Sequence, residues 1–172
     1  MKLSIAAFKA FILLLIGAVI YGFDNIGFFN QIATKITILI LVIFKTCYFM
    51  VQSYNKIKEA TEKHLPYYIF LQFMGYNIAL LMFSFGIDYF VINEGIPGSF
   101  VGVNNDCSAL RRFFDFLYYS SLNMTNFGFG TLMPLGMTAK IVTSLEVMLS
   151  FAAIIFVLSD FMSLKESMKD KK

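Results

Sequence analysis

The chain has 172 residues and a net charge of +3; 58% of its residues are hydrophobic and only 15% are charged. A soluble domain carries about a quarter charged residues, so this composition, with a mean hydropathy of +0.71, indicates an integral membrane protein. The basic residues are scattered, which gives no support to a nucleic-acid partner, and two cysteines are too few for a disulfide framework or a metal cluster.

Four apolar stretches are long enough to cross a bilayer as helices, which takes roughly 20 residues each. In chain order they cover about residues 3–23, 35–54, 66–92 and 137–162. The first stretch follows Lys2 and Lys9 as a signal peptide would, but no small-x-small cleavage site comes after it, so we expect a retained helix. With a cytoplasmic N-terminus, most lysines and arginines fall inside. This bias predicts a multi-pass protein of the plasma or inner membrane with both termini in the cytoplasm.

The segment between the third and fourth stretches has a different pattern. Residues 93–108 are rich in turn-forming residues and are predicted to form an outer loop. Residues 113–124 are apolar and aromatic but too short to span, which is typical of a re-entrant helix. The following Gly128 and Gly130 permit alternating backbone conformations that turn the carbonyl oxygens to one side. A ring of such oxygens replaces the hydration shell of a monovalent cation.

This order of elements, over about residues 115–160, resembles the tetrameric potassium channel superfamily, in which a pore helix leads into a Thr-Val-Gly-Tyr-Gly-Asp filter, a proline and the inner helix. The residues that fall on the filter, and are expected to hold cations mainly through backbone carbonyls, are Thr125, Asn126, Phe127, Gly128, Phe129 and Gly130. The residues expected to support or gate the filter are Asp115, Thr131, Pro134, Glu146 and Ser150. The resemblance implies a homotetramer in which residues 66–92 form the outer helix and residues 137–162 the inner helix.

Two departures from the family pattern concern ion preference. Thr125 and Asn126 fall on two successive threonines of the family, and the second of these contributes its side-chain oxygen to the innermost ion site. Thr131 stands where the family has the aspartate that braces the filter from behind. Potassium is the expected permeant ion, and the alternative is a non-selective channel for sodium and potassium, because Asn126, Phe127 and Thr131 all alter the filter. A further alternative is a non-conducting membrane scaffold or regulatory subunit that keeps the pore fold.

Two other departures concern packing. Phe127 replaces a valine, so its ring is expected to need a pocket among Tyr118, Tyr119, Leu122 or their neighbours. Ser150 stands where many members have a hinge glycine. A sharp bend of the inner helix that depends on glycine is therefore not expected, although a serine can still bend a membrane helix by bonding back to a carbonyl one turn earlier.

Lys45 is predicted to lie near the middle of its span, where a charge needs a partner. One hypothesis pairs Lys45 with Glu146 and so joins the N-terminal helices to the pore. In the alternative, Lys45 extends toward the membrane surface and Glu146 bonds to the pore helix. A voltage sensor is not favoured, because gating charges recur every third residue and Lys45 stands alone between Lys35 and Lys56.

The sequence therefore predicts an all-α membrane protein with four transmembrane helices and one re-entrant pore helix and filter loop, assembled as a homotetramer. It comprises an N-terminal helix pair with a cytoplasmic link (1–65), a pore domain (66–162) and a charged cytoplasmic tail (163–172). An enzyme is not expected, because the chain has one histidine and neither a His-Glu-x-x-His nor a Gly-x-Ser-x-Gly motif. No cofactor is expected. The expected partners are the lipid bilayer, further copies of the chain and monovalent cations, K+ first and Na+ as the alternative.

Overall fold

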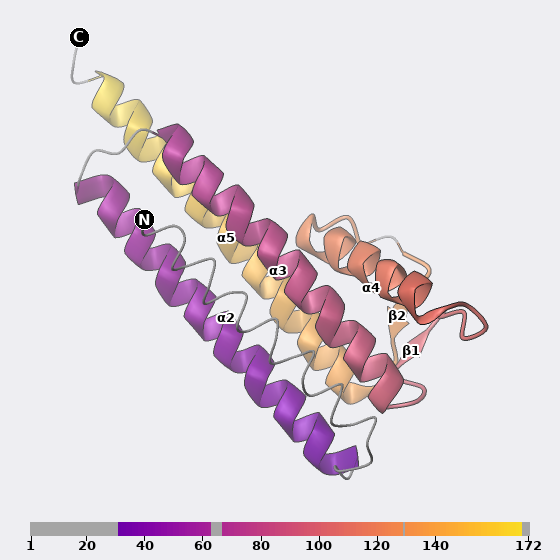
Figure 1. Cartoon of the computed structure of the whole chain (residues 1–172). Coiled ribbons are helices and arrows are strands. Elements are labelled where there is room, and N and C mark those ends of the chain that lie inside the picture. The colour runs from indigo at the N-terminus through magenta and orange to yellow at the C-terminus, as the bar shows by residue number, and fades with distance from the viewer. Residues whose placement is uncertain (1–30, 63–66, 129, 170–172) are drawn as a thin grey trace.

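The computed structural model describes residues 31–62, 67–128 and 130–169, and the helix expected at residues 3–23 lies outside them. The helices are α2 (Gln31–Glu62), α3 (Tyr67–Gly95), α4 (Ala109–Met124) and α5 (Met137–Lys169), and the strands are β1 (Phe100–Val101) and β2 (Met133–Pro134). The long helices α2, α3 and α5 pack side by side. Figure 1 shows the short helix α4 against α3 and α5, with α2 on their other side.

Three of the described helices are long and apolar enough to cross a membrane. These candidate spans are Lys35–Asn55, Leu71–Gly95 and Met137–Leu158. Both α3 and α5 are apolar with little preference for one face, as is typical of helices surrounded by lipid or protein. The chain is therefore a membrane protein, and the second, third and fourth predicted spans are confirmed as apolar helices. Beyond the fourth span, α5 continues to Lys169.

A buried ion pair joins α2 to α3. The ammonium group of Lys45 contacts the carboxylate of Asp88, donates to Ser84 Oγ at 3.0 Å and lies 3.8 Å from the centre of the Phe85 ring. The side chains of Lys45 and Asp88 are only 7% and 15% exposed. The hypothesis that Lys45 pairs with Glu146 is therefore wrong, because Asp88 lies within reach of the ammonium group and takes that place.

We expect Lys45→Met to lower the free energy of unfolding by about 2–3 kcal/mol, because it leaves the Asp88 carboxylate buried without its charge partner. Adding Asp88→Asn should restore most of this loss, since no uncompensated charge then remains. Denaturation in detergent micelles, followed by circular dichroism, measures both variants. A double variant no more stable than Lys45→Met alone would contradict the assignment of this pair.

The helix α4 packs closely across α3. Gly86 of α3 permits this approach, because a Cβ at that position would lie 3.1 Å from Leu117 Cα. The rings of Phe116 and Tyr119 pack edge-on against Phe100 of β1, with centroid distances of 5.0 and 5.9 Å. The buried side chains of α4 recur at helical spacing, and they are Phe116, Tyr119, Ser120, Asn123 and Met124. The predicted short helix at 113–124 is thus confirmed, and it begins four residues earlier than expected.

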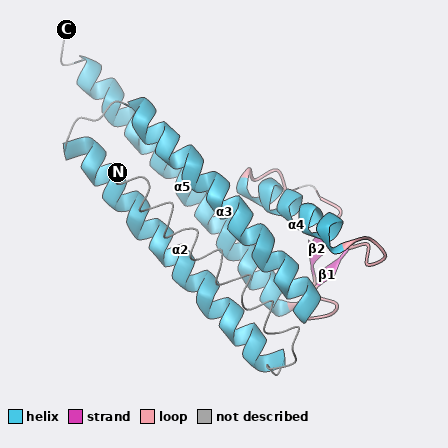
Figure 2. Ribbon diagram, viewed as in Figure 1, coloured by secondary structure: helices cyan, strands magenta, loops and turns pink. Residues whose placement is uncertain are grey.

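Two short strands connect the loop before α4 to the segment before α5 (Figure 2). They pair antiparallel, and Pro134 lies in β2 at the edge of this two-stranded sheet, where a proline is tolerated. Next to the strand pair, Ser99 O accepts hydrogen bonds from the N–H groups of Leu135 and Gly136 at 2.8 and 3.0 Å. The two ends of the segment 99–136 are therefore held together.

Candidate functional site

An asparagine closes the C-terminal end of α4. The helix ends at Met124, and Asn126 then takes a left-handed backbone conformation with φ +56°, which asparagine tolerates better than a β-branched residue does. The N–H of Asn126 bonds to Asn123 O at 3.1 Å, and that of Phe127 bonds to Leu122 O at 3.0 Å. The chain therefore leaves the helix sharply at the start of the predicted filter.

The segment that follows the helix offers unpaired oxygen atoms. Residues 125–128 are exposed, and no hydrogen bond from another described residue reaches their carbonyl oxygens. Gly128 has φ +63°, and a Cβ added there would meet nothing within 4 Å. Phe129 lies outside the described residues. Free carbonyl oxygens next to the negative end of a helix attract a cation.

Two side chains at the start of the predicted filter have well-defined positions. The hydroxyl of Thr125 donates to Ser121 O at 2.8 Å, so its own oxygen keeps free lone pairs. The ring of Phe127 is 67% exposed in the single chain. The expectation that this ring fills an aromatic pocket beside α4 is therefore wrong for one subunit.

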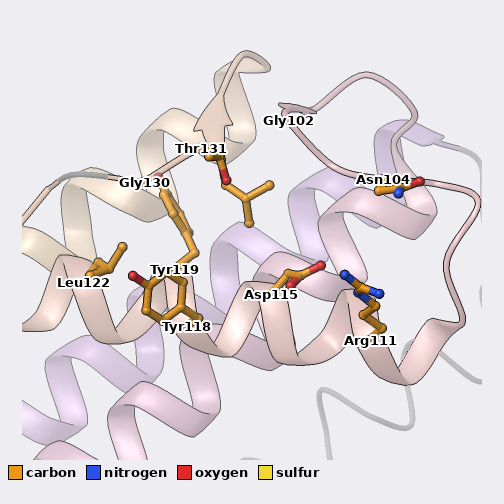
Figure 3. A pocket seen from close by; sticks show the side chains of 10 residues that line it. Gly102, Asn104, Arg111, Asp115, Tyr118, Tyr119, Leu122, Gly130 and Thr131 are labelled. Atoms are coloured by element: carbon orange, nitrogen blue, oxygen red, sulfur yellow. The ribbon is translucent and has the colours of Figure 1, made fainter.

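The predicted pocket itself exists, as a cavity of about 120 Å³ between α4 and residues 130–132. The residues of α4 that line it are Arg111, Asp115, Tyr118, Tyr119 and Leu122 (Figure 3). Asp115 and Arg111 lie one helical turn apart on α4, and Figure 3 shows Arg111 below Asn104, with Asp115 nearer to the segment that carries Thr131. Asp115 thus brings a carboxylate close to Thr131. At the position of Thr131, the potassium channel superfamily has an aspartate.

A close backbone contact fixes the far end of the filter segment. Gly102 has φ +87°, and a Cβ at this position would lie 2.1 Å from Thr131 O. No side chain fits there unless one of the two segments moves. Sequence reasoning missed Gly102, because it is one of several glycines in the outer loop and no local pattern sets it apart.

A buried polar cluster centres on Glu146 of α5, which is fully buried. Its carboxylate accepts hydrogen bonds from Tyr89 Oη of α3 at 2.5 Å, from Asn123 Nδ2 of α4 at 3.1 Å and from Ser120 Oγ of α4. Ser120 Oγ also lies 2.9 Å from Met82 O of α3. The prediction that Glu146 bonds to the short helix is confirmed for α4, and one carboxylate ties α3, α4 and α5 together. The other half of that alternative is wrong, since Lys45 pairs with Asp88 instead.

Two members of this cluster were not predicted from the sequence. Asn123 follows Ser120 by three residues, which places both polar side chains on one face of α4, and this spacing was a usable signal. Tyr89 gave no signal, since it is one of nine tyrosines in the chain.

Ser150 of α5 faces the end of α4 and is 1% exposed. Its hydroxyl donates to Met124 O at 2.6 Å and accepts from Asn126 Nδ2 at 2.8 Å. Ser150 therefore does not bond back to a carbonyl of its own helix, which is the bond by which a serine can bend a helix. The carbonyl of Met124 has lost its partner within α4, because it belongs to the last turn, and it takes the single hydroxyl proton instead.

A family model described as "Ion channel" matches residues 78–166, more than half of the chain. The chain belongs to this ion channel family. Membership confirms the resemblance to the tetrameric potassium channel superfamily, and the matched part of the channel contains most of α3, all of α4, the filter segment and most of α5. No curated protein and no solved structure matches the channel. The match begins within α3, so α2 lies outside the part that the family model covers.

Proposed function

We propose that this ion channel is selective for potassium and assembles as a homotetramer, with four transmembrane helices in each subunit and α4 as the re-entrant pore helix. Its filter is the segment Thr125-Asn126-Phe127-Gly128-Phe129-Gly130. A dehydrated K+ moves passively between sites formed mainly by backbone carbonyls and is displaced by the next ion. No cofactor takes part. The channel lies in the plasma or inner membrane, with both termini in the cytoplasm.

One observation carries this proposal. With 16 residues, α4 is too short to span, and its C-terminal end leads directly into the exposed residues 125–128, whose carbonyl oxygens accept no hydrogen bond from another described residue. Such backbone is tolerated at membrane depth only where it is buried in protein or lines a water-filled path. The positive φ of Gly128 fits a chain whose carbonyls must turn toward one axis.

The exposed apolar side chains around the filter support assembly from several copies. They are Phe114, Tyr118, Phe127, Leu135 and Met137. One short loop cannot enclose an ion, whereas four copies meeting at this face would both surround the ion and cover these side chains. Native mass measurement in detergent should therefore give four times the 19.6 kDa of the single chain.

We expect liposomes that contain the purified channel to take up K+ much faster than Na+, and Gly128→Asp to abolish this uptake. Aspartate tolerates the positive φ of Gly128 better than most residues, so the variant should keep its fold. It places a side chain and a charge in the filter. Isotope flux under K+ and Na+ gradients measures the effect, and the assembled mass of the variant checks its fold.

The same assay separates the alternatives. Comparable K+ and Na+ uptake would replace potassium selectivity with a non-selective cation channel, an outcome that Asn126 and Thr131 favour because both depart from the family filter. If a correctly assembled wild type takes up neither ion, conduction is contradicted. The remaining alternative is then a non-conducting membrane scaffold or regulatory subunit.

A further inference from the structure

The hydrogen bonds of Ser150 determine how the amide of Asn126 is turned. Met124 O can only accept, so the single hydroxyl proton of Ser150 points to it, at 2.6 Å. The oxygen of Ser150 then has only lone pairs left for its second contact. The group of Asn126 that lies 2.8 Å away must therefore be the donor Nδ2, since a flipped amide would set two acceptors against each other.

The backbone of Asn126 is held as well as its side chain. Its N–H bonds to Asn123 O, and with a φ of +56° it is the left-handed residue that follows the C-cap of α4. Ser150 is buried, whereas Asn126 is exposed. With Nδ2 committed to Ser150, Oδ1 is the remaining polar atom of the side chain, and no hydrogen bond from another described residue reaches it. Amide oxygens are good ligands for hard cations.

We infer that Ser150 is a positioning residue, which turns the Asn126 amide oxygen toward the ion path and so sets the ion preference at the inner end of the filter. This inference rests on the proposed function, because it needs residues 125–130 to be the filter. Four copies would then present a ring of amide oxygens to the cation. Each amide oxygen is held in place from α5 through one group, the hydroxyl of Ser150.

The test compares Ser150→Ala with Ser144→Ala in the full chain, reconstituted in planar bilayers. Ser144 is a matched control, because it lies on the same helix and its hydroxyl bonds within α5, to Lys140 O at 2.9 Å. We expect Ser150→Ala to lower the K+/Na+ permeability ratio about three- to tenfold, the effect of losing one hydrogen bond. Ser144→Ala should leave the permeability ratio unchanged. Ser150→Thr keeps the hydroxyl and should therefore also keep the wild-type permeability ratio. If Ser150→Ala does not assemble, Ser150→Cys replaces it, with a weaker donor of similar size.

A second background shows whether Ser150 acts through the amide. Asn126→Gly keeps the positive φ without strain and removes the side chain. In this background, Ser150→Ala should no longer change the permeability ratio. An equal change in both backgrounds would overturn the inference, because Ser150 would then act through the packing of α5 on α4. An unchanged permeability ratio for Ser150→Ala in the wild-type background would also overturn the inference.

A binding measurement keeps this test separate from conduction. Bound K+ raises the temperature at which an assembled channel dissociates, so K+ and Na+ titrations of the dissociation temperature report ion preference without flux. If the wild type conducts and Ser150→Ala matches it in both readouts, only the present inference fails. If the wild type does not conduct but Ser150→Ala loses protection by K+, conduction fails and the inference stands. A wild type that neither conducts nor gains protection overturns both.

Discussion

Glu146→Ala is expected to lower the free energy of unfolding of the channel by about 4–5 kcal/mol, among the largest effects of any single substitution. The carboxylate is fully buried, and it is the acceptor for the Tyr89 hydroxyl, the Asn123 amide and the Ser120 hydroxyl. Alanine leaves Tyr89 and Asn123 without this acceptor and opens a cavity between the helices. Chemical denaturation in detergent micelles, followed by circular dichroism, measures the loss.

Glu146→Gln provides the matched control. It has nearly the same shape and keeps one acceptor oxygen, but its amide donor faces groups that are donors themselves. We therefore expect a smaller loss, of about 1–2 kcal/mol. If Ala and Gln at position 146 cost the same, the lost hydrogen bonds of the carboxylate would account for the whole effect, and the cavity left by alanine would contribute nothing. Because Ser120 and Asn123 belong to α4, ion flux should also fall in both variants.

Gly102→Ala is expected to destabilise the channel by more than about 4 kcal/mol or to prevent assembly, because its Cβ would lie 2.1 Å from Thr131 O. Relief requires the outer loop and the end of the filter to move apart. We therefore also expect a loss of ion selectivity in any protein that does assemble. Thermal unfolding and the K+/Na+ flux ratio measure the two effects.

Gly98→Ala separates backbone strain from this contact. Gly98 has a similar positive φ, +77°, but a Cβ there would meet nothing within 4 Å. In Gly98→Ala, the backbone strain alone should lower the free energy of unfolding by about 1–2 kcal/mol. The K+/Na+ flux ratio should stay unchanged. If Gly98→Ala and Gly102→Ala have equal effects, the close approach to Thr131 O would not be the cause.

The sequence predicted the helices well, because each depends on a local signal. Apolar length alone marks α2, α3 and α5, and the short aromatic run before Gly128 marks α4. The strands were not predicted. Each has two residues, and each pairs with a segment about 30 residues away that only the packing of α4 brings near. The sequence therefore predicted only turns in the outer loop.

The contacts within the site were predicted only in part. The filter positions followed from the order of Thr125, the two glycines and Pro134, and Glu146 was correctly placed against α4. The partner of Lys45 was missed, although Asp88 is the one charged residue in the predicted span 66–92 and gave a usable signal. The bond from Asn126 to Ser150 had no local signal, since it depends on the register between α4 and α5.

The segment from Ser99 to Gly136 begins and ends at the same point in space, because Ser99 O receives the N–H of Gly136. A stretch with adjoining ends can be exchanged without changing the separation of the flanking helices, as in loop transplantation and domain insertion. Chimaeras between members of the family should therefore be joined at these two residues and not at the ends of α4. Evolution has the same route open to it: a new filter segment can arrive as one cassette, provided that α5 keeps Ser150 and Glu146, which bond to it from outside.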